Sequence, residues 1–466
     1  MRIGRRTGTL AGLAAVTTGM LLGPYTTAQA TEKGHHRDPV EVFSTHLPAL
    51  ATIGGVKVTG GGYGSALAAK PGSGSEFYGL TDRGPNVDAP NGTDKIEPLP
   101  SFTPAIGLFR FTGSGDAVLE RRIPLRDAKG NPYSGAVNPD NTTSESIVDL
   151  SGAPIPASPD GYDPEGLVAL PDGSFWISDE YGPFITHFNA HGQQIGRLSP
   201  LDGSLPAELQ HRVVNKGMEG LTLTPDGHTL VGIMQNTLAN GISSKKAKAD
   251  VPVRIVTVDL RTHRTHEYLY LLASSSTGNS EITALSDHEF LVDERDGAFP
   301  SATGVKKLWK IDTRKATDLG PGSTLAGAVY DGSAAGGALG LTIGGKTPEQ
   351  LLDGLTSADA ATALTTLGIT PVAKPATPYL DLDALLTSID PSGAFFAHDK
   401  IEGVVARDGG RTLVISNDSD FGIDGATSGA ADGISPPYAL HAKFTPAGVQ
   451  DDGQFLVVHL NRLGSK

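Results

Sequence analysis

The chain is predicted to be an all-β protein, specifically a β-propeller of about six blades. Many short apolar runs lie between turn signals, and the 466 residues include 60 glycines and 32 prolines. This composition favours short strands over long helices. A similar hairpin pattern also occurs four times, and its first three copies follow one another at close to the length of a four-stranded propeller blade, about 40 to 50 residues.

Each copy of the hairpin has an acidic residue, then an apolar run, a turn rich in Asp and Gly, and a second apolar run that ends in polar residues. The copies span residues 163–182, 217–236, 280–297 and 401–422. Because a hairpin folds back on itself, the beginning of its first strand lies beside the end of its second. Repetition around an axis therefore gathers the acidic residues at one end of the propeller.

The rest of the chain fits the same architecture. Residues 65–84 contain a weaker copy of the hairpin, and the interval from Glu281 to Glu402 has room for two blades or for one blade and an insertion. Near residues 340–390 the sequence changes to Gly, Ala, Thr and Leu, which predicts a helical and loop insertion. Its helices are expected after a capping box at residues 347–350, from a cap at Ser357 or Asp359 to near Gly368, and over residues 381–389.

Residues 1–30 have the features of a secretory signal peptide. Arginines at positions 2, 5 and 6 precede an apolar segment, Thr9–Leu22, and a small-residue cleavage site at Ala28–Ala30. The paired arginines leave both the general and the twin-arginine export routes open. The apolar segment is too short to span a bilayer, so residues 31–466 are predicted to be one secreted propeller domain without a membrane anchor.

Charge and cysteine content limit the possible functions. The formal net charge is −14 and no long basic run reverses it locally, so nucleic acid and anionic membranes are not expected as partners. The chain has no cysteine, which excludes disulfides, thiolate metal sites and a cysteine nucleophile. We expect a monomer that acts on a small molecule.

The acidic residues at the hairpin ends are the main functional candidates. Their oxygens suit Ca²⁺, which usually takes six to eight oxygen ligands. Closely packed acids either bind a cation or have raised pKa values, and both are common at functional sites. The alternative is that each glutamate accepts backbone N–H bonds from the neighbouring blade. The predicted metal ligands are Glu165, Asp179, Glu219, Glu281, Asp293, Glu402, Asn417 and Asp418, with Asn215 and Asp420 as further oxygen donors.

Basic residues occur at matching positions of the hairpins, namely Arg83, Lys216, Arg295 and Lys400. Close to bound calcium they would bind a phosphate or another oxyanion, and arginine can hold two oxygens at once. Salt bridges to the adjacent carboxylates are the alternative. Lys216 and Tyr181 are predicted to contact the substrate, although Tyr181 could instead only pack.

Several other enzyme classes lack support. Residues 340–347 match the phosphate-loop pattern, but a Gly- and Ala-rich run precedes them instead of a buried parallel strand, so nucleotide binding is not expected. The sequence contains no G-x-S-x-G and no H-E-x-x-H motif. A serine hydrolase on an α/β fold and a zincin site are therefore not predicted.

Five motifs occur in order over nearly all of the mature chain: GLTDRGP (79–85), YDPEGL with WISDEYGP (162–183), NKGMEGLTLTPDG (215–227), SEITAL with FLVDERDG (280–297), and IEGVV with ISNDSDFG (401–422). In this order they resemble the secreted phytase-like propeller family described as having "esterase-like activity of phytase". The resemblance implies a propeller hydrolase of phosphoric esters that uses calcium.

The resemblance also implies site residues, namely Glu165, Asp179, Glu180, Glu219, Glu281, Glu294, Arg295, Glu402, Asn417 and Asp418. The second hairpin departs from the acidic pattern because it ends in Gln235 and Asn236, which weakens one ligand position.

The leading hypothesis is metal-assisted hydrolysis of a phosphate ester. Glu180 or Glu294 would act as general base, while Arg83 and Arg295 would stabilise the developing charge. One alternative is a calcium-dependent lactonase or carboxylic esterase on the same propeller. Another is a non-catalytic extracellular module that binds a ligand at the propeller mouth.

Overall fold

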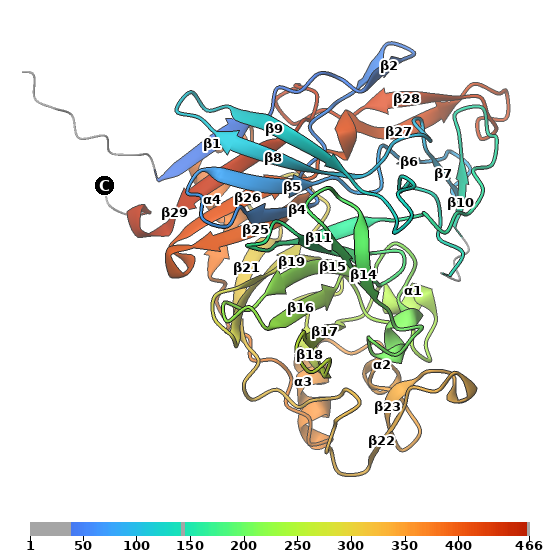
Figure 1. Ribbon diagram of the computed structural model, residues 1–466, viewed down its shortest axis with the longest axis vertical. Helices are drawn as coiled ribbons and strands as arrows, with labels where there is room; N and C mark the ends of the chain where they lie inside the picture. The colour runs from blue at the N-terminus through green and yellow to red at the C-terminus, as the bar shows by residue number, and fades with distance from the viewer. Residues whose placement is uncertain (1–38, 141–144, 464–466) are drawn as a thin grey trace, which may run out of the picture. The chain divides into compact units, whose positions relative to one another are not determined.

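The computed structural model describes residues 39–140 and 145–463, and their fold is mostly β. The predicted signal peptide, residues 1–30, lies outside the described residues. Within the described part, five four-stranded sheets form most of the structure (Figure 1). The all-β prediction is confirmed, whereas the predicted number of about six blades is one more than these five sheets.

The five sheets are called blades 1 to 5, and each is given from its inner strand outward. Blade 1 contains β4 (Ala66–Ala69), β5 (Glu76–Leu80), β8 (Ala105–Phe111) and β9 (Ala117–Pro124). Blade 2 contains β11 (Pro164–Ala169), β12 (Phe175–Asp179), β13 (Ile185–Phe188) and β14 (Gln194–Leu198). Blade 3 contains β15 (Met218–Leu223), β16 (Thr229–Met234), β17 (Pro252–Asp259) and β18 (Thr265–Leu271). Blade 4 contains β19 (Gly278–Ala284), β20 (Glu289–Arg295), β21 (Lys306–Asp312) and β24 (Leu380–Asp381). Blade 5 contains β25 (Ile401–Arg407), β26 (Thr412–Asn417), β29 (Gln454–His459) and β1 (Val40–Ser44).

The inner strands form a closed ring. Each of β4, β11, β15 and β19 contacts the inner strand of the following blade, and β25 contacts β4 again. Blade 5 combines both ends of the described chain, because β1 pairs with β29 from Val40 opposite Val458 to Ser44 opposite Gln454. This pairing covers the outer edge of β29 and holds the ring closed.

The Glu-Gly pairs of the sequence lie where neighbouring inner strands meet. A Cβ atom on Gly166 would lie 2.6 Å from the backbone nitrogen of Leu221 in blade 3. A Cβ atom on Gly220 would lie 2.5 Å from the nitrogen of Ile282 in blade 4. Gly403 approaches blade 1 in the same way. The glycine of each pair therefore allows close backbone packing around the axis.

Replacing Gly220 by alanine is expected to lower the free energy of unfolding by about 1 to 3 kcal/mol, because the added methyl group overlaps the backbone of blade 4. Urea unfolding followed by tryptophan fluorescence measures the change. Gly74→Ala is the matched control, since a Cβ atom there would meet no heavy atom within 4 Å. Equal stability of the two variants would contradict the proposed packing.

The insertion near residues 340–390 lies mostly within blade 4: α2 (Pro348–Leu352) and α3 (Ser357–Thr366) come between β21 and β24, and α4 (Leu382–Ile389) follows β24. The predicted capping box at Thr347 is confirmed, but α3 is capped by Thr356 instead of Ser357 or Asp359. These helices contact strands of blades 3 and 4. β23 (Gly340–Ile343) pairs antiparallel with β22 (Ala328–Asp331), so the phosphate-loop pattern lies on a hairpin.

Smaller elements extend the ends of the blades. They are β2 (Ala51–Ile53), β3 (Val56–Val58), β6 (Val87–Asp88), β7 (Asp94–Ile96), β10 (Ser146–Val148), β27 (Ile423–Ser428), β28 (Tyr438–Ala442) and α1 (Ser244–Ala247). None of the helices formed by the described residues combines the length and the apolar character that crossing a membrane requires.

Candidate active site

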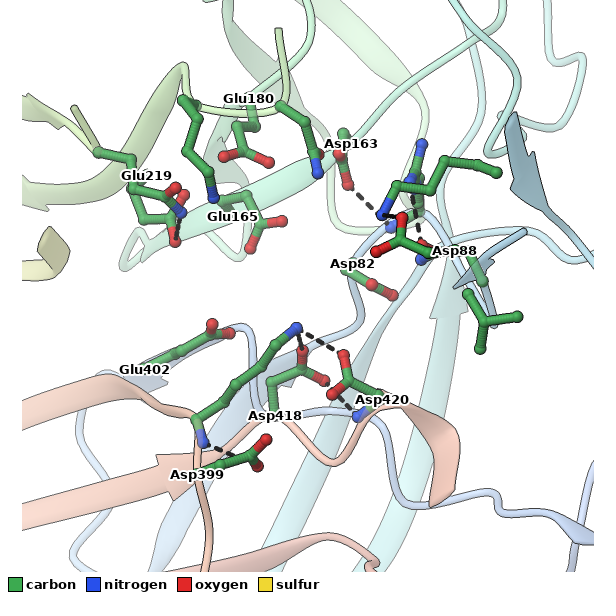
Figure 2. A pocket seen from close by; sticks show the side chains of 18 of the residues that line it. Asp82, Asp88, Asp163, Glu165, Glu180, Glu219, Asp399, Glu402, Asp418 and Asp420 are labelled. Carbon is green, nitrogen blue, oxygen red and sulfur yellow. Dashed lines mark hydrogen bonds and ion pairs between the residues drawn. The ribbon is translucent and has the colours of Figure 1, made fainter. Parts of the chain in front are cut away.

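A polar cavity of about 360 Å³ lies at the end of the ring where the inner strands begin. Figure 2 shows its carboxylates in two groups that face each other. Glu165, Glu180 and Glu219 come from blades 2 and 3, and Glu402 and Asp418 come from blade 5. Residues far apart in the sequence therefore meet around one opening, which is called the acidic cavity below.

Bulges at the beginning of the inner strands direct three glutamates into the acidic cavity. The strand register shifts between Pro164 and Leu167 in blade 2, between Met218 and Gly220 in blade 3, and between Ile401 and Val404 in blade 5. A bulge adds a residue to one strand and re-aims its side chain. Here the re-aimed residues include Glu165, Glu219 and Glu402, all of which line the cavity.

Blade 4 carries the same bulge on a different residue. Asn279 pairs with Glu294 and Glu281 pairs with Asp293, so Ser280 occupies the position of the three cavity glutamates. Glu281 occupies the position that is glycine in blades 2, 3 and 5, and its Oε1 accepts a bond from the backbone nitrogen of Ile282 at 2.9 Å. The structure therefore does not bring Glu281 into the acidic cavity.

The ends of the second strands form the outer part of the site. One residue at or just after the end of each second strand lines the cavity. These residues are Asp82 after β5, Glu180 after β12, Gln235 after β16, Arg295 at the end of β20 and Asp418 after β26. Glu294 precedes Arg295 and points away from the cavity. Its carboxylate is bonded by the Tyr270 hydroxyl, the Lys374 ammonium and the backbone nitrogen of Ala273. Of the two glutamates predicted as general base, only Glu180 lines the cavity.

Four further predicted residues are buried beside the acidic cavity and do not line it. Asp179 Oδ1 accepts bonds from the backbone nitrogens of Asp163 and Tyr181 at 3.2 and 3.0 Å. Asn417 Oδ1 accepts a bond from the nitrogen of Gln454 at 2.7 Å. Tyr181 is fully buried, with its hydroxyl bonded to Glu145, and Asp293 is 2% exposed. The structure places these four residues in the walls of the site.

Three carboxylates form the best candidate for holding a cation. Oxygen atoms of Asp163, Glu165 and Glu180 lie within 4.8 Å of one another, and all three residues are buried. The side-chain amide of Asn215 reaches the same point, where its nitrogen can donate to Asp163 Oδ2 at 3.1 Å and to Glu180 Oε2 at 2.8 Å. If the amide is turned so that its oxygen faces them, Asn215 becomes a fourth oxygen ligand. The donor set is therefore all oxygen, as calcium prefers.

Burial gives the cavity acids a high proton affinity. Burial raises the pKa of Asp163 to about 6, although the nearby Arg83 lowers it. Burial also raises the pKa of Glu402 to about 7, although Arg295 lowers it. Burial is also the main cause that raises the pKa of Glu165 and of Glu219, and nearby carboxylates raise both further. Without a cation, several of these groups hold a proton near neutral pH.

Basic residues surround the carboxylates, and most of them are already paired. Arg83 contacts Glu145 at 3.3 Å and Asn86 at 3.0 Å, and Arg295 is paired with Glu402. Lys400 bridges Asp418 and Asp420. Lys216 lines the cavity and forms no salt bridge with any residue of the described ranges. It is the cation best able to bind a substrate anion.

The sequence prediction missed several residues that line the cavity. Asp163 belongs to the DPEG motif, two residues before Glu165, and Asp82 belongs to the weaker first hairpin, so both carried a usable signal. Asp399 and Lys443 carried none, because they lie outside the hairpin repeats. Lys443 bonds Asp399 at 2.6 Å and Asp420 at 2.7 Å, which fixes one wall of the cavity.

The chain is similar to solved structures at low sequence identity. Virginiamycin B lyase from Staphylococcus aureus is 12% identical, with 90% of this chain and 98% of that chain covered and a TM-score of 0.30. A protein from Lactobacillus plantarum is 13% identical, with 65% and 94% covered and a TM-score of 0.27. Neither similarity is close enough to support a statement about fold or activity.

The sequence comparisons are more specific. An uncharacterized secreted protein of Arthroderma benhamiae is 28% identical over 226 residues, which cover 37% of this chain and 44% of that protein. The chain thus spans less than half of that relative, whose description as secreted agrees with the predicted location. A family model, phytase-like with the description "Esterase-like activity of phytase", matches residues 59–421. These residues include the first three hairpins, nearly all of the fourth and most of the residues that line the acidic cavity, and the chain belongs to this phytase-like family.

Proposed function

We propose that the protein is a secreted, calcium-dependent hydrolase of phosphoric esters and that the acidic cavity is its active site. The observation that carries the proposal is the convergence of Asp163, Glu165 and Glu180, with oxygens within 4.8 Å of one another, beside Lys216, which forms no salt bridge within the described ranges. Membership of a family described by esterase-like activity supports ester hydrolysis.

The residues fit a calcium ion. Glu180 Oε1 and Glu219 Oε2 are buried and have no hydrogen-bond partner among the described residues. Leaving buried carboxylate oxygens unsatisfied is costly, and a cation together with the water that it binds would satisfy them. Asp163, Glu165, Glu180 and Asn215 would hold the ion. When bound, calcium would polarise the phosphoryl oxygens and lower the pKa of a bound water.

The protein's own residues then have separate roles. Lys216 binds and orients the anionic phosphoryl group, because its ammonium has no protein partner in the described ranges. Glu180 Oε1 accepts the proton of the attacking water, which requires the ionised form of Glu180. Burial raises the pKa of Glu180, whereas Lys216 lowers it. Arg83 and Arg295, each held by a carboxylate, keep positive charge at the edge of the site.

The experiment is a release assay on p-nitrophenyl phosphate after dialysis against a chelator. We expect phosphate release to disappear with chelation and to return on addition of CaCl₂. p-Nitrophenyl acetate and a lactone are assayed in parallel. Phosphate release that persists after complete calcium removal would contradict the proposed mechanism.

A carboxylic ester or lactone is the second candidate substrate, and one observation favours it. Arg83 and Arg295 are paired with Glu145 and Glu402, so Lys216 is the one cavity cation among these three without a salt bridge to a described residue. A less charged substrate needs fewer free cations. Faster calcium-dependent turnover of the acetate or the lactone than of the phosphate ester would favour this candidate.

Calcium binding at pH 7 is expected to release on the order of one proton. Calcium binds ionised carboxylates, and some of these carboxylates carry a proton in the calcium-free protein. Among the proposed ligands, the folded-state pKa of Asp163 is raised to about 6, and the pKa values of Glu165 and Glu180 are also raised. The pKa of the neighbouring Glu402 is raised to about 7. The calcium-free protein should therefore lose stability as the pH rises from about 4 to 7, and calcium affinity should increase over the range 6 to 8. Calorimetry in Pipes and in Tris, whose ionisation enthalpies differ, measures the released protons. Equal binding enthalpies in the two buffers would contradict this prediction.

A further inference from the structure

A second polar cavity, of about 280 Å³, lies directly beside the acidic cavity. The two cavities share Lys216, Gln235 and Arg295. Gln235 Nε2 donates to Glu219 Oε1 at 2.5 Å and thereby fixes the boundary between them. The remainder of the second cavity is formed mainly by residues 275–280, which lead into β19, and by Lys248 after α1.

The two cavities differ in charge. Eleven acidic and six basic residues line the acidic cavity, whereas three basic residues and one acidic residue line the second cavity. That acidic residue, Asp296, is neutralised within the protein. Its carboxylate accepts bonds from Lys306 Nζ at 3.2 Å and from the backbone nitrogens of Ala298 and Val305 at 3.1 and 2.9 Å. The second cavity is therefore suited to an anion.

The second cavity also offers groups without protein partners. Neither Lys216 nor Lys248 forms a salt bridge with a residue in the described ranges, and the side chain of Lys248 is exposed. Asn279 is fully buried, and its Oδ1 has no hydrogen-bond partner among the described residues. Asn279 Oδ1 can accept a bond from a ligand hydroxyl, and the two ammonium groups can bind an oxyanion.

We propose that the second cavity binds the alcohol half of the ester and selects alcohols that carry an oxyanion, a carboxylate or a phosphate. The inference rests on the proposed function of the acidic cavity. Because both cavities include Lys216, an ester bound in the acidic cavity extends into the second without leaving the site. Lys248 then contacts the oxyanion of the alcohol and determines specificity, at a distance from the reacting bond.

The test compares kcat/KM for phenyl phosphate, 4-carboxyphenyl phosphate and hydroquinone 1,4-bisphosphate in the presence of calcium. We expect the two esters with an additional anion to be preferred by about two- to fivefold, the effect of one partly exposed ion pair. The ester with the larger preference identifies whether a carboxylate or a phosphate is favoured. In Lys248→Met the preference should fall to about one. Lys245→Met is the matched control, because Lys245 is exposed in α1 and does not line the cavity.

A binding measurement separates this proposal from the function on which it depends. Phenylphosphonate and 4-carboxyphenylphosphonate cannot be hydrolysed, and their affinities for the calcium-loaded protein are measured by calorimetry. Equal affinities, or a preference that survives in Lys248→Met, would overturn the second binding site while leaving the phosphate-ester site intact. If neither phosphonate binds and no ester is hydrolysed, the proposed function fails and the second site fails with it.

Discussion

Replacing Glu180 by glutamine is expected to lower kcat on p-nitrophenyl phosphate by about 10²- to 10⁴-fold, which is the usual contribution of a general base. Glutamine keeps the size of the side chain but cannot accept a proton from water. Among the described residues, Glu180 Oε1 is buried without a hydrogen-bond partner, so this oxygen is available for that role. The rate at saturating substrate and calcium is the decisive measurement.

A calcium titration separates the loss of a base from the loss of a ligand. Glu165→Gln removes a charged ligand, so we expect its activity to recover as the calcium concentration increases. The activity of Glu180→Gln should stay low at every calcium concentration. Glu120→Gln is the control, since this residue is paired with Arg110 on the outer strands of blade 1. Full recovery of Glu180→Gln at high calcium would show that Glu180 is only a ligand.

The sequence predicts most of the inner part of the site because each residue of the Glu-Gly pair has its own structural role. The glutamate lies in a bulge that faces the cavity, and the glycine allows the next blade to approach. Blade 4 lacks this pair. Its glutamate, Glu281, follows the bulge, and Ser280 occupies the bulge position and lines the second cavity instead. A one-residue shift in a strand moves side chains to the other face, so alignment on the glutamate alone misplaces this position.

The same shift affects the second strand of blade 4. Alignment on acidic residues places Glu294 at the position of Glu180, whereas the strand register places Arg295 there. The wall formed by Asp399 and Lys443 could not be predicted, because both lie in connections whose positions depend on tertiary packing. The predicted number of about six blades is also higher than the five four-stranded sheets, because the sequence does not show how the interval after Glu281 is divided. The interval between Glu281 and Glu402 holds blade 4 and the insertion, and β1 completes blade 5 from the beginning of the described chain.

Outside the site, the insertion is joined to blade 3 by a buried charge cluster. Arg254 of β17 contacts Glu267 of β18 at 3.1 Å and Glu349 of α2 at 2.8 Å, and all three side chains are fully buried. Glu208, in the connection before blade 3, is also buried and accepts a bond from the Tyr330 hydroxyl at 2.8 Å. Burial raises the pKa of Glu267, and the neighbouring Glu208 raises it further. One arginine thus compensates a group of carboxylates.

Replacing Arg254 by methionine is expected to lower the free energy of unfolding by about 3 to 5 kcal/mol, because it leaves buried carboxylates without their cation. Glu267 then holds a proton in the folded state, because burial and the neighbouring Glu208 raise its pKa above that of the unfolded chain. The variant should therefore be most stable near pH 5 and should lose stability as the pH rises toward 8, and more steeply than the wild type. Urea unfolding at several pH values measures both effects.

Arg261→Met, an exposed change on the turn between β17 and β18, should stay within about 0.5 kcal/mol of the wild type. Adding Glu349→Gln to Arg254→Met should restore part of the loss, since it removes one of the uncompensated charges. If Arg254→Met unfolds like the control at every pH, the cluster does not hold the insertion on blade 3.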